Sequence, residues 1–127
     1  RVTKDQLPQL IVAAESDFGA GQVYQLSTLF DQSSLAKTEE LFELLAPLGV
    51  AKGKNDARGG PDVSILPKYK VPVVNLYQDG TYYFDYHHTP NDTLDKIKPE
   101  DLQQNSAVWA TFAAFMANSG IDPRASQ

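Results

Sequence analysis

The chain has 127 residues, 42% of them apolar and 21% charged, which suits one modest globular domain and is too short for two. Its net charge of -5 and its scattered lysines and arginines argue against a nucleic-acid partner, because phosphate binding needs clustered positive charge. No stretch is long and apolar enough to predict a membrane span, and the absence of cysteine excludes disulfides and thiolate metal sites.

The first predicted strand is an apolar run at residues 10–14. It turns polar at Glu15 and Asp17, which is the pattern of a short strand buried on both faces. Residues 17–25 follow, and their two glycines indicate a loop.

Leucines at helical spacing predict a helix over residues 38–49. Thr38 is its expected N-cap and Gly49 its expected stop, while Pro47 should end the regular helix early. Residues 51–62 then read as a polar, glycine-rich loop.

A second buried strand is expected at residues 71–76, followed by an aromatic loop at residues 80–92. A last amphipathic helix starts near Pro99 and closes at residues 118–120. Apolar strands that alternate with helices predict an α/β fold with a mostly parallel sheet.

In such a sheet, ligands bind beyond the carboxyl ends of the strands, and this rule places Asp17 and the adjacent pair His87 and His88 on one rim. Imidazole and carboxylate together suit Zn²⁺ or a similar ion. An aspartate after a strand is also a common turn or cap residue, and adjacent histidines are often surface residues, so both interpretations stay open. A catalytic zinc needs about three protein ligands, and this chain offers Asp17 and one histidine.

Three segments, in order along the chain, resemble the dinuclear zinc aminopeptidases and are most similar to their carboxypeptidase Q-like branch. "AAESDFGAG" at residues 13–21 looks like the family's Glu-x-Asp-x-Gly segment. "GGPD" at residues 59–62 looks like its Gly-Gly-x-Asp loop, and "HTPNDT" at residues 88–93 matches His-Thr-x-x-Asp-Thr before a Pro-started helix. The resemblance implies that residues 1–127 are the carboxyl-terminal part of a single peptidase domain. The implied fold is a partial three-layer sandwich of the phosphorylase/hydrolase-like type.

The resemblance also implies roles for individual residues. Asp17 matches the terminal carboxylate ligand of one zinc ion, and His88 matches the imidazole ligand of the other. His87 matches no ligand position and is expected only as a neighbour of His88. Asp62 would lie near the substrate pocket, either contacting substrate or holding its own loop.

Asp92 and Thr93 are expected to hold the His88 loop in shape, since a ligating histidine needs a partner on its other ring nitrogen. Asp92 is also a candidate turn or helix-cap residue. The family's His-x-Asp motif, which supplies the bridging ligand, is absent from this chain. Glu39 and Glu40 follow the Asp17 segment, whereas the family's catalytic Glu-Glu pair precedes it. They are therefore expected to be solvated surface residues.

The missing groups would lie upstream of Arg1, so the chain is expected to be an inactive portion of a zinc-dependent exopeptidase that acts on peptides. The alternatives are a non-catalytic, transferrin-receptor-like binding domain and a self-contained binding module. By resemblance the parent protein would be periplasmic or extracellular. A sheet cut from its neighbours leaves a free edge, so the isolated chain is expected to self-associate, by edge pairing or by swapping the helix that starts at Pro99.

Overall fold

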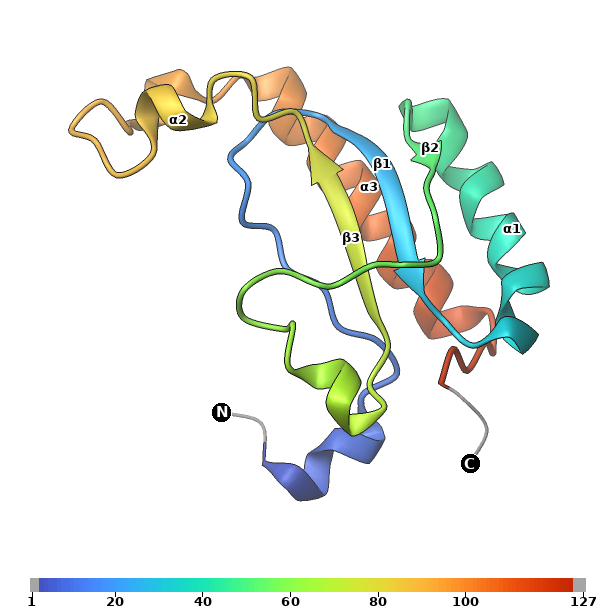
Figure 1. Cartoon of the computed structure of the whole chain (residues 1–127). Helices are drawn as coiled ribbons and strands as arrows, with labels where there is room; N and C mark the ends of the chain where they lie inside the picture. Colours follow the sequence, from blue (N-terminus) through green and yellow to red (C-terminus); the bar gives the residue numbers. More distant parts are fainter. Residues whose placement is uncertain (1–2, 125–127) are drawn as a thin grey trace.

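The structure is a computed structural model that describes residues 3–124 of the chain. A small sheet lies at the centre, with α3 behind it and α1 beside it (Figure 1). The strands and α-helices are β1 (Val23–Leu29), α1 (Leu35–Leu45), β2 (Ala51–Lys52), β3 (Val73–Gln78), α2 (Tyr83–Tyr86) and α3 (Pro99–Asn118). The short 3-10 turns are η1 (Lys4–Gln9), η2 (Gln32–Ser34), η3 (Ala46–Leu48), η4 (Leu66–Tyr69) and η5 (Leu94–Lys96).

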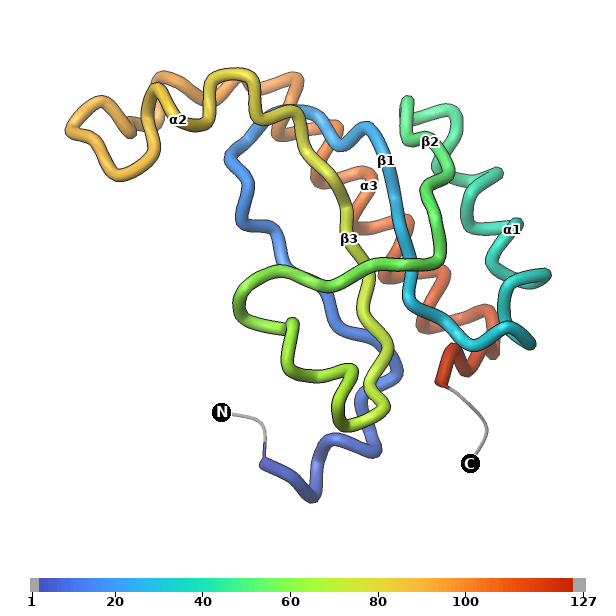
Figure 2. The backbone as a smooth tube through the Cα atoms, in the orientation of Figure 1, coloured from blue at the N-terminus to red at the C-terminus, as the bar shows by residue number. Residues whose placement is uncertain are grey.

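The sheet has three strands in the order β2-β1-β3. Strand β1 pairs in parallel with β2 and antiparallel with β3, so the predicted α/β class is confirmed but the prediction of a mostly parallel sheet is wrong. The apolar run of β3 reflects burial on both faces and not strand direction. Helix α3 covers one face of the sheet, and the loop at residues 53–72 crosses the other (Figure 2).

Residues 10–14 form no regular strand, which corrects the first strand prediction. Ala13 makes only an isolated parallel bridge to Val73. The segment nevertheless runs beside β3, and its alternate residues Val12 and Ala14 pack against the core. It therefore covers part of the outer edge of β3, as a short additional strand would.

Strand β1 begins at Val23, inside the loop predicted at residues 17–25, and continues to Leu29. Polar residues Ser27 and Thr28 interrupt its apolar pattern, yet both are buried. The Thr28 hydroxyl donates to Asn55 Oδ1 at 2.8 Å, and Gly53 packs directly against Ser27. These partners come from the loop after β2, so the strand's burial depends on a distant segment that local periodicity does not reveal.

Helix α1 begins earlier than expected, and Thr38 lies inside it. The buried Thr38 hydroxyl donates to Ser34 O at 2.8 Å, so the N-cap prediction is wrong. Regular helix ends at Leu45 before Pro47, and Gly49 terminates the turn with a left-handed φ of 83°, both as predicted. Helix α3 starts at Pro99, also as predicted.

One apolar core joins the sheet to both long helices. Its most deeply buried side chains are those of Val23, Leu26, Leu41, Leu45, Val74 and Val108. The two helices also contact each other, so α3 is held between β1 and α1.

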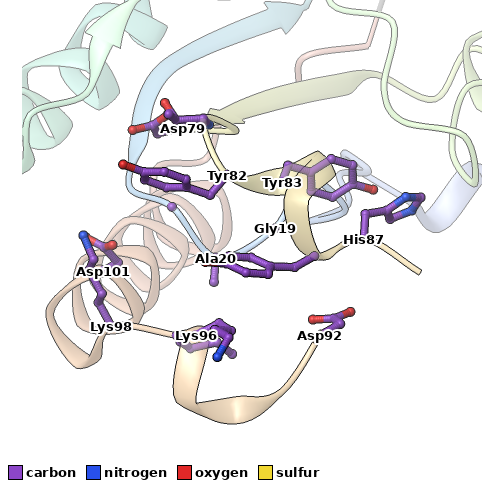
Figure 3. Close-up of a pocket in the computed structure, with 14 residues that line it drawn as sticks. Gly19, Ala20, Asp79, Tyr82, Tyr83, His87, Asp92, Lys96, Lys98 and Asp101 are labelled. Atoms are coloured by element: carbon purple, nitrogen blue, oxygen red, sulfur yellow. The ribbon is translucent and has the colours of Figure 1, made fainter. Parts of the chain in front are cut away.

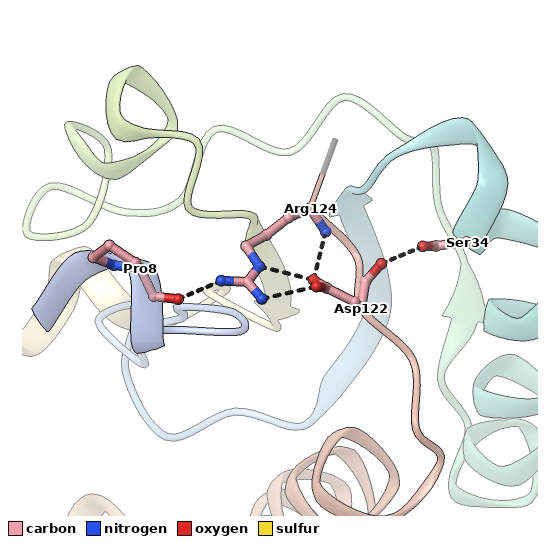
Figure 4. A network of polar contacts seen from close by, with 4 residues as sticks. All are labelled: Pro8, Ser34, Asp122 and Arg124. Atoms are coloured by element: carbon pink, nitrogen blue, oxygen red, sulfur yellow. Dashed lines mark hydrogen bonds and ion pairs between the residues drawn. The ribbon is translucent and has the colours of Figure 1, made fainter. Parts of the chain in front are cut away.

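The segment after α3 is tied back to the start of the chain (Figure 4). The Arg124 guanidinium donates to both carboxylate oxygens of Asp122, at 2.8 and 2.7 Å, and to Pro8 O. The Asp122 carbonyl in turn accepts from Ser34 Oγ at 2.8 Å. The Arg124 guanidinium holds the pKa of Asp122 below its usual value.

Candidate metal site

Asp17 lies on an exposed loop, residues 16–21, which we call the Asp17 loop. The loop is fastened on both sides of Asp17 to the last residue of β3. Ser16 Oγ donates to Gln78 Oε1 at 3.1 Å, and Gln78 Nε2 donates to Gly19 O at 2.9 Å. The Asp17 carboxylate is therefore exposed on a loop whose backbone is held in place.

The histidines follow the single turn of helix α2. The His87 backbone N–H donates to Tyr83 O at 2.9 Å and closes that turn. His88 then adopts a left-handed φ of 56°, which is uncommon for a residue that is not glycine. The two imidazole rings stack with centroids 3.7 Å apart, and both histidines are exposed.

A continuous row of stacked rings joins the Asp17 loop to this turn. Phe18 stacks on Tyr83 at 4.3 Å between centroids, Tyr83 stacks on His87 at 4.6 Å, and His87 stacks on His88. Phe18 also packs over Gly80, where a Cβ would lie 1.9 Å from the Phe18 ring. The two segments that carry the predicted ligands thus form one packed rim, although they are far apart in sequence.

The loop of Asp62 is hydrogen-bonded to Glu15, just before the Asp17 loop, and to Asn75 of β3. The Asp62 backbone N–H donates to Glu15 Oε2 at 2.9 Å. The backbone N–H groups of Arg58 and Gly59 both donate to Asn75 Oδ1, at 2.9 and 3.1 Å. The Asp62 side chain is exposed, and both proposed roles for it remain predictions.

Glu15 supports the Asp62 loop, a role that the sequence analysis did not predict. Its only signal in the sequence is that it opens the Glu-x-Asp-x-Gly segment. Gly60 approaches this carboxylate so closely that a Cβ would lie 1.6 Å from Oε1. Oε1 itself is buried and has no hydrogen-bond partner among residues 3–124.

The turn after His88 has its own hydrogen bonds. The Asp92 backbone N–H donates to Thr89 O at 3.1 Å, and the Thr93 hydroxyl contacts Asp95 and donates to Asn91 O at 3.3 Å. These contacts shape the turn itself. The predicted support of His88 by the Asp92 and Thr93 side chains remains a prediction.

A pocket of about 580 Å³ opens beside the rim (Figure 3). Tyr82, Tyr83 and His87 bound one side of it, and Asp92 and Lys96 bound the other. Lys96 Nζ donates to Asp95 Oδ2 at 2.6 Å, and this hydrogen bond raises the pKa of Lys96, so the ammonium keeps its charge. His87 thus faces the pocket, in addition to stacking on His88.

Residues 16–113 match the model of Peptidase family M28. The chain belongs to peptidase family M28. The resemblance to carboxypeptidase Q-like metallopeptidases that the three sequence segments indicated is confirmed.

Among M28 relatives, carboxypeptidase Q of Rattus norvegicus is 30% identical over 115 residues, and that of Pongo abelii is 31% identical over 104 residues. These alignments cover 91% and 82% of this chain but only 24% and 22% of the relatives. A crystal structure of a peptidase M28 precursor from Shewanella amazonensis is 52% identical, with a TM-score of 0.89. It aligns over 98% of this chain and 29% of its own length. The chain therefore spans about a quarter of the length of these M28 proteins.

M28 peptidases use zinc, and a catalytic zinc ion needs about three protein ligands. Carboxylate and imidazole are suitable zinc ligands, and Asp17 and His88 are both exposed. No cluster of three or more potential ligands occurs in residues 3–124. The donors thus fit zinc in kind but not in number. In the same described part of the chain, no helix is both long and apolar enough to cross a membrane.

Proposed function

We propose that this chain is the carboxyl-terminal part of the peptidase domain of an M28 zinc exopeptidase of the carboxypeptidase Q type. Asp17 would bind one zinc ion and His88 the other. The observation that supports this is the packed rim, in which stacked rings connect the loops of two residues that are 71 positions apart (88 − 17).

The chain's own residues would orient the ligands. Stacking on His87 limits rotation of the His88 ring, and the bonds from Gln78 hold the backbone on both sides of Asp17. Such preorganisation lowers the entropy lost when a ligand binds its ion. Two ligands of a paired-metal site should lie within about 10 Å of each other, because the ions are roughly 3.5–4 Å apart.

When bound, the zinc pair would supply a water of lowered pKa and polarise the scissile carbonyl. The bridging carboxylate and the general base would come from residues outside this chain. The substrate would be a peptide, and the fixed loop of Asp62 would line its path. The chain alone would then bind zinc weakly and hydrolyse nothing.

One observation favours a second function, a non-catalytic binding domain like that of the transferrin receptor. Tyr82, Phe84 and Leu94 are large apolar side chains that remain 61%, 75% and 81% exposed. They lie in the segment that projects from the rest of the molecule in Figure 1. Exposed apolar groups in a projecting segment suit contact with another protein.

A zinc titration of the isotope-labelled chain, followed by backbone NMR, tests the proposal. Zinc should shift the signals of Asp17 and His88 together. Asp17→Asn and His88→Ala should each raise the apparent Kd by at least about tenfold, since each removes a ligand. The matched control Asp56→Asn removes an exposed carboxylate from a position that is not a proposed ligand, and should change the Kd less than about threefold.

A chromogenic aminoacyl substrate completes the test, and no turnover is expected from the chain alone. Turnover that His88→Ala abolishes would show that the chain holds a complete catalytic set, and the proposed division of the site would be wrong. If zinc shifts NMR signals of other residues but not those of Asp17 and His88, the result would favour the binding-domain alternative.

A further inference from the structure

Two buried side-chain amides lie directly beneath the Asp17 loop. Gln78 ends β3 and is 6% exposed, while Asn105 lies in α3 and is 8% exposed. Gln78 Nε2 donates to Asn105 Oδ1 at 2.7 Å, so the amides form a pair that joins the sheet to the helix. Buried amides are costly unless they are satisfied, which makes their partners informative.

Most of those partners belong to the Asp17 loop. Gln78 accepts from Ser16 Oγ and donates to Gly19 O, as described above. Asn105 Nδ2 donates to Gly21 O at 2.9 Å and to Asp101 O within its own helix at 2.8 Å. The pair therefore contacts the loop before Asp17 and twice after it.

The hydrogen bonds of the two amides allow only one orientation of each side-chain amide group. An amide nitrogen has two hydrogens, and both hydrogens of Gln78 and both hydrogens of Asn105 are used. Each side-chain oxygen also accepts one bond. Flipping either amide would place a donor against a donor or an oxygen against a carbonyl, so the pair defines one loop conformation.

We propose that Gln78 and Asn105 are positioning residues that set the place of the Asp17 carboxylate on the rim. The assignment to metal binding rests on the proposed function, whereas the control of the loop stands on the contacts alone. Ser16 and Gly19 flank Asp17 in the chain, and both are hydrogen-bonded to Gln78. Fixing the chain on both sides of Asp17 thus limits where its carboxylate can lie.

The test uses isosteric variants that remove donors and preserve shape, Gln78→Glu and Asn105→Asp. Gln104→Glu is the matched control, because Gln104 is also an amide of α3 that bonds backbone, at Val23 and Leu48, but it does not touch the loop. Ser16→Ala is a milder variant that removes one loop contact and leaves the buried pair intact, in case a buried carboxylate prevents folding.

Backbone NMR relaxation and zinc titration provide separate measurements. Gln78→Glu and Asn105→Asp should lower the backbone order parameters of residues 18–20 to flexible values below about 0.6, while those of Leu26 and Val74 stay near 0.85. The same variants should raise the apparent zinc Kd by about tenfold. Ser16→Ala should act in the same direction and raise the Kd by about threefold, and Gln104→Glu should leave the order parameters of residues 18–20 unchanged.

Equal order parameters at residues 18–20 in the Gln78 and Gln104 variants would overturn the proposal. Lower order parameters with an unchanged zinc Kd would also overturn it, because the loop would then move without moving a ligand. If zinc does not shift Asp17 in the wild-type chain, the proposed function fails. The relaxation data still decide whether the pair fixes the loop.

Discussion

Replacing Gly60 by alanine should destabilise this chain only while Glu15 is present. The new Cβ would lie 1.6 Å from Glu15 Oε1, so the carboxylate must leave its position. It then loses the hydrogen bond from the Asp62 N–H, which is 2.9 Å long. A hydrogen bond to a charged group contributes roughly 1.5–3 kcal/mol. Gly60 has no left-handed φ, so the alanine by itself stabilises the folded state by about 0.4–1 kcal/mol, because it lowers the conformational entropy of the unfolded chain.

The net cost of Gly60→Ala is therefore about 1–2 kcal/mol in the wild-type background. In a Glu15→Ala background no carboxylate remains to displace, and the same substitution should be neutral or stabilising by up to about 1 kcal/mol. Denaturant unfolding of the four proteins of this double-mutant cycle measures the difference. Equal costs in the two backgrounds would refute the reasoning, since they would show that Gly60 does not act through Glu15.

Two further predictions concern the whole chain. The folded-state pKa of Asp122 is lowered by Arg124, so its stabilisation is present above the unfolded pKa of about 3.9 and is lost as pH falls through the folded pKa. Thermal melts should show wild type above Asp122→Asn at pH 7, with the gap closing toward pH 2.5; a constant gap would contradict the ion pair. Light scattering should show an average mass that rises with concentration, because β2 leaves a short sheet edge unpaired within residues 3–124. A monodisperse monomer at all concentrations would contradict self-association.

Sequence reasoning located the helices better than the sheet, for a physical reason. The spacing of leucines and the position of Pro99 are local signals, and α1 and α3 follow them. Strand β1 depends on Asn55 and Gly53 to bury its polar residues, and these partners are distant in sequence. Strand direction has no local signal when both faces are covered, and so the mixed sheet was predicted as parallel.

The candidate site remains a prediction, and the sequence motifs indicate it only as three separate positions, Asp17, Asp62 and His88. The row of rings that joins the Asp17 loop to the histidine turn exists only in three dimensions, because Phe18 and Tyr83 meet across the rim. The sequence predicts Glu15 only as the polar end of a strand, because its bond to the Asp62 loop joins residues 47 positions apart.

The contacts around the rim indicate how the proposed ligands could be held in place before zinc binds. Glu15 accepts a hydrogen bond from the Asp62 loop, and Gln78 is bonded to Ser16 and Gly19. Asp17 lies between Ser16 and Gly19 in the chain, so protein contacts hold the backbone around it. A ligand that is positioned before its ion arrives needs no further ordering when the remaining donors are supplied. This is the physical reason to expect the Asp17 loop of this chain to hold its conformation without zinc, and to expect tight zinc binding only when the missing donors join it.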